Sequence, residues 1–571
     1  MEKIKKLKTL FNFFDIDGYI VPKNDEFFNE YIPCNKDNLK FISDFSGSFG
    51  FALIIKNKNY LFVDGRYTLQ AEQQSGKNFE IINLAKKLPF NVLKNKKLKI
   101  GFNSKLFTQK TLSILFKNFN RLKPIDEDLI EKIQVRKIKE SRKKFYALPK
   151  KAFDQSHKIK IRILIKWLIK RKIDIHFVSS SENISWLLNI RGQDLKYTPS
   201  NNSYLIIDTN YKINLFCDLK KLNRSFILKF KKIKFIDIKF LSLFLSKIKN
   251  KNILIDSTSC SFYYENLLNG RNFINKTNDP IYNFKSRKTK NEMSNIIKSH
   301  LYDGVALTKF LFWIKKNYLK ANINEIIAQD KLYKFRKKNK KFKFSSFPTI
   351  SGSGPNGAII HYRATNKSNR KLKKGDIYLV DSGGQYNFGT TDVTRTISLG
   401  NNNQRIKEIF TRVLKGHIAV ASFKLSKKTT GSQIDSAARK PLKKIKLDYP
   451  HGTGHGVGYF LNVHEGPQAI SKKNNICFQD GMIISNEPGY YEKGKFGIRI
   501  ENLLRVKKNG KKIVFDNLTL APIDKSLIDK KNLNFDEINW LNKYHNRVFT
   551  SLKKFMNKSE IEDLKLACSR I

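Results

Sequence analysis

The chain has 571 residues, with 110 Lys and Arg against 49 Asp and Glu, so its formal net charge is +61. This length predicts two to four domains of ordinary size, and a hydrophobic fraction of 40% allows a sizeable core. No uncharged run approaches the roughly 18 apolar residues of a membrane-spanning helix, so we expect a soluble protein.

The positive charge is spread through the whole sequence. Stretches such as "KLPFNVLKNKKLKI" and "FRKKNKKFKF" carry no RNP-like aromatic motif and no paired zinc-ligand spacing. A general compositional bias, as an AT-rich genome would produce, therefore explains the charge better than a nucleic-acid partner, which remains the alternative. The five cysteines are scattered without a CxxC pair, and the basic N-terminus has no cleavage site, so we expect a cytoplasmic protein.

The first two predicted domains have the same order of elements. In 1–153, the stretches "DGYIVP", "FALIIKNKNYLFVDGRY" and "KLKIGFN" predict strands, the second of them a hairpin that turns at 56–59. In 154–285, the helical "KIKIRILIKWLIKRKI" is followed by apolar segments such as "SYLIID", "INLFCD" and "NILID". Both patterns favour an α/β domain.

A third domain is predicted over 286–525, opening with the helical stretch "KNEMSNIIKSHLYDGVALTKFLFWIKKNYLK". The remaining segment, 526–571, predicts a short helical extension docked on that domain. Its helical spacing is carried by Ile538, Leu541, Tyr544, His545 and Val548.

Two aspartates in the third domain are placed to face each other. The stretch "GDIYLVDSGGQYNFGTTDVTRTIS" predicts two strands joined by a turn near Asn387 and Gly389. Asp381 and Asp392 then lie on opposite arms of the hairpin with converging side chains. Two facing carboxylates repel each other unless a positive charge sits between them.

Two glutamates lie on further predicted strands. "MIISNEPGYY" and "KFGIRIENLLRV" predict one strand each and contribute Glu487 and Glu501. In the second, the period of two places Arg499 and Glu501 on one face and apolar residues on the other. Together with His455 the set has four carboxylates and one imidazole, too many ligands for one tetrahedral zinc. Two divalent ions that share bridging carboxylates would satisfy it, with Mn²⁺, Co²⁺ or Zn²⁺ suited to these donors.

These residues lie in motifs that resemble a known family. "DSGGQYNFGTTDVTRT", "HGTGHGVGYFLNVHEGP", "SNEPGYY" and "GIRIENL" closely resemble the motifs of the Xaa-Pro aminopeptidases (aminopeptidase P), of the creatinase/methionine aminopeptidase superfamily. "VPKNDEFFNEY" and "NISWLLNIRG" resemble the N-terminal domains of that family. The resemblance implies an α/β (α+β) fold: two similar creatinase-like α/β domains, a pita-bread catalytic domain and a short helical C-terminal extension.

The resemblance also implies roles for individual residues. Asp392 and Glu501 would hold both of two divalent ions, Mn²⁺ foremost, and Glu487 would act as the acid/base as well as a ligand. From its position beside Glu501, we expect Arg499 to orient the carboxylates rather than to contact substrate. The implied metal ligands are Asp381, Asp392, His455, Glu487 and Glu501, and the implied substrate-binding histidines are His361, His451 and His464.

The implied reaction is hydrolysis of the bond between an N-terminal residue and a following proline. The implied partners are Xaa-Pro peptides and a second copy in a homodimer, with no specific nucleic acid and no membrane. A prolidase-like dipeptidase shares the ligands and is the nearest alternative. A nucleic-acid- or ribosome-binding protein on the same scaffold is the alternative from another class, although such members usually lose ligands and this chain keeps them all.

Several other residues resemble site residues. "GSGPNG" at 352–357 fits GxGxxG, but the following "AIIHYRAT" is β-rich where a dinucleotide motif needs a helix, so we expect a substrate-side loop. His417 falls on the apolar side of a predicted helix and is expected in the core. Arg66 is expected either to reach a neighbouring subunit's substrate or to form a strand-end ion pair. We assign no role to His157, His176, His300 and His545.

Overall fold

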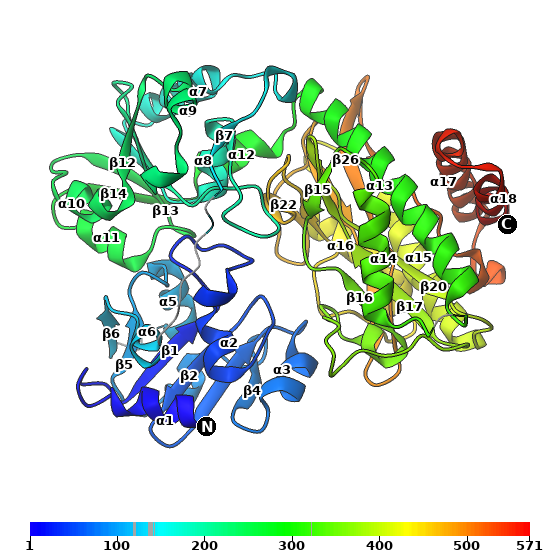
Figure 1. Ribbon diagram of the computed structural model, residues 1–571, viewed down its shortest axis with the longest axis horizontal. Coiled ribbons are helices and arrows are strands. Elements are labelled where there is room, and N and C mark those ends of the chain that lie inside the picture. The colour runs from blue at the N-terminus through cyan, green and yellow to red at the C-terminus, as the bar shows by residue number, and fades with distance from the viewer. Residues whose placement is uncertain (118–120, 135–140, 142, 321) are drawn as a thin grey trace. The chain divides into compact units, whose positions relative to one another are not determined.

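The computed structural model of the protein divides into two compact units (Figure 1). Unit 1 comprises Met1–Pro149 and Gln155–Tyr282, and unit 2 comprises Lys150–Asp154 and Asn283–Ile571. The residues that the structure describes are 1–117, 121–134, 141, 143–320 and 322–571.

The first sheet of unit 1 is mixed, with strand order β4-β3-β2-β1-β5-β6. The central strand β1 pairs antiparallel with β2 and parallel with β5, and β2 and β3 form the expected hairpin around 56–58. The strands are β1 (Gly18–Pro22), β2 (Phe51–Ile55), β3 (Asn59–Val63), β4 (Glu80–Asn83), β5 (Ile100–Asn103) and β6 (Leu122–Ile125). The helices are α1 (Glu2–Thr9), α2 (Asn38–Ser43), α3 (Thr68–Ser75), α4 (Pro89–Leu93), α5 (Gln109–Phe116) and α6 (Leu129–Ile133).

This sheet is buried on both faces, because side chains alternate along each strand. Tyr19 and Val21 of β1 belong to one apolar cluster, whereas Ile20 between them belongs to another. A fully apolar strand such as "GYIVP" is therefore explained by helices on both sides of it.

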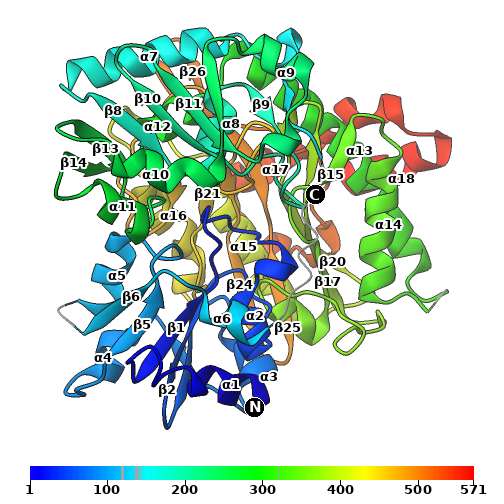
Figure 2. The ribbon, with the colours of Figure 1, turned by 60° about the vertical axis from the view of Figure 1, so that its left-hand side comes forward.

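The second sheet of unit 1 repeats the first, with order β12-β11-β10-β8-β13-β14. Here β8 pairs antiparallel with β10 and parallel with β13, as β1 does with β2 and β5, so the repeated element order is present. Figure 2 shows β8, β10 and β11 side by side. The strands are β8 (Ile175–Val178), β10 (Tyr204–Asp208), β11 (Ile213–Cys217), β12 (Ile233–Asp237), β13 (Asn252–Asp256) and β14 (Phe273–Thr277). The helices are α7 (His157–Lys170), α8 (Ser181–Leu187), α9 (Arg224–Lys229), α10 (Leu241–Ser246), α11 (Phe262–Leu268) and α12 (Pro280–Ser286).

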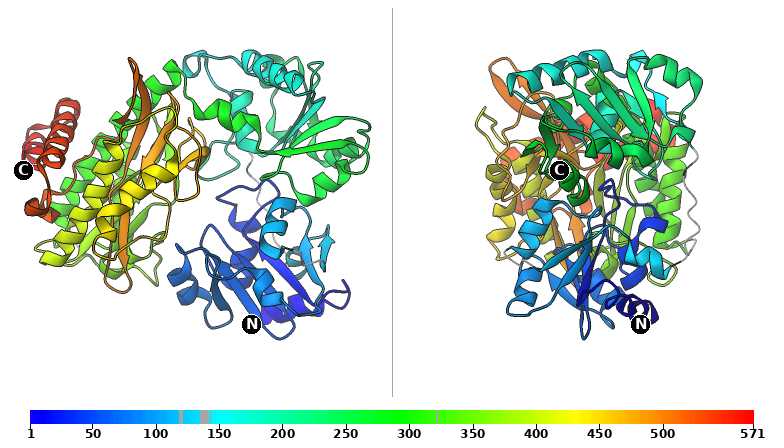
Figure 3. Two further views of the ribbon diagram at one scale, coloured as in Figure 1. Left: turned by 180° about the vertical axis from the view of Figure 1, so that it is seen from behind. Right: turned by 90° about the vertical axis from the view of Figure 1, so that its left-hand side faces the viewer.

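Unit 2 places its strands between two helix pairs, α13 with α14 and α15 with α16 (Figures 1 and 3). At the start of its long helix α13, the Thr289 N–H donates to Glu292 Oε2 at 2.9 Å, which satisfies one free N–H at the helix N-terminus. Among the described residues, no helix combines the length and apolar character needed to cross a bilayer. The helices are α13 (Lys290–Asn317), α14 (Glu325–Lys337), α15 (Gln404–Ala421), α16 (Gly431–Lys443), α17 (Phe535–Leu552) and α18 (Lys558–Cys568).

The strands of unit 2 form several small sheets. One has the order β16-β17-β20 and another the order β22-β21-β23-β26-β27, while β15-β18-β19 and β24-β25 are separate. Their bounds are β15 (Phe342–Ser345), β16 (Ile350–Ser353), β17 (Ile377–Ser382), β18 (Gly384–Tyr386), β19 (Gly389–Thr390), β20 (Val393–Ser398), β21 (Gly454–Gly456), β22 (Glu465–Ile470), β23 (Ile483–Asn486), β24 (Gly489–Glu492), β25 (Phe496–Arg499), β26 (Asn502–Asn509) and β27 (Lys512–Asn517).

The C-terminal helix α17 is part of the core of unit 2. Asn534 and Glu537 form a capping box at its start, which fixes where the helix begins. Its inward side chains, expected from their spacing, join one apolar cluster with Ile498 and Ile500, at the end of β25. Burying each of its large aliphatic side chains contributes about 1.5–3 kcal/mol. The buried side chains of α17 are Leu541, Tyr544, His545, Val548 and Leu552.

Two sequence-based strand predictions were wrong in detail. "MIISNEPGYY" and "KFGIRIENLLRV" each form two strands, interrupted at Glu487–Pro488 and at Ile500–Glu501. Pro488 has no N–H to continue a ladder, and the chain changes sheets at both breaks. "AIIHYRAT" is not a strand: a 3₁₀ helix, Gly354–Ala358, leads into an irregular loop.

The predicted domain bounds do not coincide with the two compact units. Unit 2 begins at Asn283, just before the predicted start at 286, and it also includes Lys150–Asp154 around the predicted boundary at 153. The division into 1–153, 154–285, 286–525 and 526–571 stays a prediction.

Candidate metal centre

Asp381 and Asp392 lie at one end of a strand pair. In the β17–β20 ladder Asp381 is opposite Thr394, and Asp392 directly precedes β20. Between them, β18 and β19 form a hairpin in a different sheet, so the single hairpin expected from the sequence is divided between two sheets. The ladder register brings both carboxylates to the same end of the pair, where Asp381 is 8% and Asp392 4% exposed.

Glu487 and Glu501 occupy the two strand breaks. Glu487 follows β23, and its backbone N–H donates to Thr453 O at 2.8 Å. Glu501 lies between β25 and β26, and its N–H donates to Thr394 O at 3.2 Å. Thr394 also donates from Oγ1 to Glu501 Oε2 at 2.8 Å. Because each break takes the chain out of the regular ladder, the glutamates can turn toward the aspartates.

His455 lies on β21 beside these carboxylates. Its Nε2 is 3.4 Å from Asp392 Oδ2 and 3.4 Å from Glu487 Oε1. Its Nδ1 donates to Gly456 O at 2.8 Å, which leaves Nε2 directed at the acids. Burial alone would lower the pKa of His455, but the hydrogen bond to Asp392 and the charge of Glu487 raise it to about 9.

The ligand atoms of these side chains form three overlapping groups. Within each group the nitrogen or oxygen atoms lie within 4.8 Å of one another. All five predicted metal ligands belong to at least one group, and His464, predicted to bind substrate, belongs to one as well. The groups are Asp392–His455–His464, His455–Glu487–Glu501 and Asp381–Asp392–Glu501.

The electrostatics of this cluster require positive charge. Burial and the neighbouring carboxylates raise the pKa of Glu501 well above its usual range and also raise the pKa of Asp392. Among the described residues, Asp381 Oδ1 is buried without a hydrogen-bond partner. Buried carboxylates in such a cluster are stabilised by metal coordination or by protonation. Oxygen donors with one or two imidazoles fit two hard or borderline divalent ions.

Arg499 links the centre to a tyrosine that the sequence analysis missed. Its Nη2 donates to Asp381 Oδ2 at 2.7 Å and its Nη1 donates to Tyr491 Oη at 2.6 Å. Tyr491 Oη is also 2.9 Å from His451 Nε2, and because His451 Nδ1 donates to Gly452 O, the tyrosine hydroxyl donates to Nε2. Burial raises the pKa of Tyr491 to about 12, so it stays a proton donor at neutral pH. The adjacent tyrosines in "PGYY" were the available signal.

His361 lies in the irregular loop that follows the GxGxxG-like motif. Arg499 Nη2 also donates to Ile360 O at 3.4 Å, which places the backbone next to His361 against the Arg499 side chain. Buried Glu325 holds this loop: its Oε1 accepts from the Ser353 N–H at 2.7 Å and its Oε2 from Tyr362 Oη at 2.8 Å. Glu325 was not among the residues predicted from the sequence.

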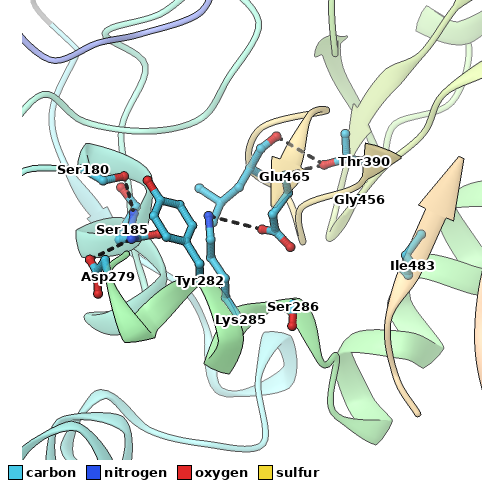
Figure 4. A network of polar contacts seen from close by, with 12 residues as sticks. Ser180, Ser185, Asp279, Tyr282, Lys285, Ser286, Thr390, Gly456, Glu465 and Ile483 are labelled. Carbon is cyan, nitrogen blue, oxygen red and sulfur yellow. Dashed lines mark hydrogen bonds and ion pairs between the residues drawn. The ribbon is translucent and has the colours of Figure 1, made fainter. Parts of the chain in front are cut away.

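A buried ion cluster holds the segment next to His464. Glu465 directly follows His464 and pairs with Gly456, the residue after His455. Its side chain bonds to Lys288 Nζ and lies 3.4 Å from Lys285 Nζ, with all three side chains buried. Figure 4 shows Lys285 pointing toward Glu465. This cluster fixes the end of the loop between the two histidines.

The remaining candidates lie outside the cluster. His417 is fully buried in the core, as expected, with Nδ1 3.1 Å from Asn486 O. His176, to which the sequence assigned no role, has an acidic neighbour in the folded chain: its Nε2 is 3.6 Å from Asp279 Oδ1. Arg66 forms an ion pair of 2.6 Å with Asp64 at the end of β3, which favours the local alternative.

Family profiles match the chain in four consecutive segments. The profile of metallopeptidase family M24 matches residues 294–508, and that of the C-terminal region of this peptidase matches residues 512–571. Creatinase/prolidase N-terminal domains match residues 3–135 and 136–292. The fold class predicted from the sequence is therefore confirmed.

Individual relatives match over the full chain. Xaa-Pro aminopeptidase 1 of Dictyostelium discoideum is 37% identical over 99% of this chain and 95% of its own length. Probable Xaa-Pro aminopeptidase P of Laccaria bicolor is 36% identical over 100% of this chain and 93% of its own. The crystal structure of X-prolyl aminopeptidase from Caenorhabditis elegans, a cytosolic enzyme with a di-nuclear active site, has a TM-score of 0.94 and 30% identity, covering 100% of this chain and 99% of that one.

Proposed function

Because the chain belongs to the Xaa-Pro aminopeptidases of metallopeptidase family M24, we propose that it hydrolyses the bond between an N-terminal residue and a following proline. The observation that carries this proposal is the set of three interlocking groups of acidic and imidazole ligand atoms. The substrates would be peptides with an N-terminal Xaa-Pro sequence.

Two divalent ions would be held by Asp381, Asp392, His455, Glu487 and Glu501. Asp392, His455 and Glu501 each belong to two of the three groups, and of these only the two carboxylates, each with two oxygens, could serve both ions. Mn²⁺ is the ion we propose, with Co²⁺ and Zn²⁺ as alternatives, because oxygen donors dominate the set. When bound, the pair of ions supplies a water activated as a nucleophile near neutral pH.

The protein's own side chains would transfer protons and orient the substrate. Glu487, whose Oε1 accepts a hydrogen bond of 3.0 Å from Ser485 Oγ, would take the proton of the nucleophile and pass it to the proline nitrogen as the peptide bond breaks. His361, His451 and His464 would donate to the substrate and to the oxyanion that develops on the carbonyl.

Tyr491 would keep His451 in one tautomer, since the tyrosine hydroxyl donates to His451 Nε2. Arg499 would hold Asp381 and Tyr491 at fixed distances through its two Nη atoms. The imidazole of His451 would thus be aimed at the substrate by a chain that begins at a metal ligand.

We also propose a cytoplasmic homodimer, in keeping with the relative that is described as cytosolic. The test of the proposed function is an assay of the Mn²⁺-reconstituted protein on Xaa-Pro dipeptides and on longer Xaa-Pro peptides. Release of the N-terminal residue from the longer peptides is the expected result. Cleavage of dipeptides alone would favour the prolidase-like alternative, and cleavage of neither would contradict the proposal.

A further inference from the structure

Arg395 is a fully buried cation beside the metal centre. It lies on β20, three positions after Asp392, and is 1% exposed. Burial lowers its pKa, and its five N–H groups meet carbonyls, an amide and a phenol, so dipoles rather than a hydrogen-bonded carboxylate stabilise its charge. Its hydrogen-bond acceptors are Pro522 O, Thr394 O, Glu501 O, Asn502 Oδ1, Ala521 O and Tyr544 Oη, at 2.7–3.0 Å.

One series of hydrogen bonds links the C-terminal extension to Glu501 through Arg395. Tyr544 of α17 accepts from Arg395 Nη2 at 2.8 Å and donates from Oη to Ala521 O at 2.8 Å. Arg395 Nη1 donates to Glu501 O at 2.7 Å. The main chain of Glu501 is therefore held from the extension side, at the break between β25 and β26.

A second series of contacts links the C-terminal extension to Asn486, the residue before Glu487. Trp540 stacks on Tyr544 with ring centroids 5.4 Å apart and meets His417 edge-on at 5.9 Å. His417 Nδ1 donates to Asn486 O at 3.1 Å, and Asn486 Nδ2 donates back to His417 O at 2.9 Å. This reciprocal pair fixes the end of β23, directly before Glu487.

We propose that Tyr544 and Trp540 of the C-terminal extension are positioning residues of the metal centre. Both glutamates lie where the strand ladders are interrupted, so the regular sheet does not by itself fix their backbone. Helix α17 supplies support at both breaks, through Arg395 for Glu501 and through His417 for Glu487. This inference rests on the proposed function, because it takes the two glutamates to be metal ligands.

The competing explanation is that α17 only completes the apolar core. Tyr544→Phe distinguishes the positioning role from this packing role, because it keeps the ring and the stacking on Trp540 and removes only the hydroxyl. Tyr204→Phe in unit 1 is the matched control: Tyr204 is 1% exposed and its Oη donates to Glu26 O at 2.6 Å. Each substitution thus removes one buried hydroxyl from a tyrosine.

The experiment uses the full chain, stripped of metal with a chelator and titrated with Mn²⁺ by calorimetry. Tyr544→Phe is expected to weaken Mn²⁺ binding by about 10-fold or more, the range found when groups that orient metal ligands are removed. Excess Mn²⁺ should restore most of its kcat on an Xaa-Pro peptide. Tyr204→Phe should bind Mn²⁺ within about 2-fold of the wild type, whatever its melting temperature.

Trp540→Phe provides a second variant, expected to weaken Mn²⁺ binding in the same direction should Tyr544→Phe not fold. Wild-type Mn²⁺ affinity in a folded Tyr544→Phe or Trp540→Phe would overturn the positioning role and leave the proposed function intact. A wild-type protein that takes up no Mn²⁺ would overturn the metal centre, and the positioning role with it.

Discussion

Arg499 Nη2 and Asp381 Oδ2 form a hydrogen-bonded ion pair of 2.7 Å between two buried side chains. The pair occupies Oδ2 of Asp381 and leaves the buried Oδ1 without a hydrogen-bond partner among the described residues. Arg499 therefore orients a proposed metal ligand without competing for the oxygen that would bind metal.

Arg499→Lys is expected to lower kcat/KM on an Xaa-Pro peptide by about 10- to 100-fold. The guanidinium reaches Asp381, Tyr491 and Thr394 from one rigid plane, which an ammonium on a flexible stem cannot reproduce. Steady-state kinetics at saturating Mn²⁺ measure the loss. Arg405→Lys, at an exposed ion pair with Glu492, is the control and should keep wild-type activity. Unchanged kcat/KM in Arg499→Lys would show that the fork geometry is dispensable.

The purified protein is expected to hold about two divalent ions per chain. Asp392→Ala and Glu501→Ala should each lose both ions, because a bridging carboxylate serves both at once. Elemental analysis after dialysis measures the content, with Glu492→Ala, whose carboxylate pairs with Lys495, as a control that retains metal. A single tightly held ion in the wild type would contradict the dinuclear arrangement.

Glu487→Gln tests the proton-transfer role. The amide keeps the size and one ligand oxygen but cannot accept a proton, so turnover should fall by at least about 10²- to 10⁴-fold. The measurement is kcat together with bound metal, since a loss of metal would explain the fall equally well. Near-normal turnover with metal retained would leave Glu487 as a ligand only.

Lowering the pH is expected to destabilise the folded protein, because its buried histidines resist protonation. Burial lowers the pKa of His176, His417 and His545 to about 3 each, against about 6.5 in an unfolded chain. Below pH of about 6.5 the unfolded chain binds protons that the folded chain cannot, so the free energy of unfolding falls as pH drops from about 6.5 toward 3. Each histidine contributes up to about 1.4 kcal/mol per pH unit.

Urea unfolding at several pH values measures this slope. His545→Gln should reduce it by about one proton, since the other two histidines remain. A free energy of unfolding that stays flat between about pH 6.5 and 5 would contradict the assignment of these groups as neutral in the folded protein.

The effect of ionic strength distinguishes the peptidase hypothesis from the nucleic-acid-binding hypothesis. A net charge of +61 will attract polyanions at low salt, but binding through phosphate contacts falls steeply with ionic strength and should be largely gone by about 0.2 M. Xaa-Pro cleavage should survive that salt, because buried ligands at short range are screened far less than surface charges. Both are followed in one buffer series. Tight, sequence-selective nucleic-acid binding at 0.2 M with no hydrolysis would favour the binding protein.

Much of the fold could be predicted from the local periodicity of apolar residues. The hairpin of β2 and β3, the repeated order of the two N-terminal sheets and the buried stripe of α17 follow from apolar spacing, because strand and helix geometry place residues two or 3–4 apart on one face. The same logic failed at Glu487 and Glu501. The residues around them have strand composition, but the chain changes sheets there, which depends on what each half of the segment pairs with.

The sequence by itself also determined which acids and histidines to consider, because their order within glycine-rich motifs resembles that of one enzyme family. Their use as ligands stays a prediction. Only the tertiary structure decided how they are supported: Tyr491 between Arg499 and His451, and Arg395 bonded to Tyr544, 149 positions away. Such contacts have no local signature, because the distance between two side chains far apart in sequence is set by the path of the whole chain between them.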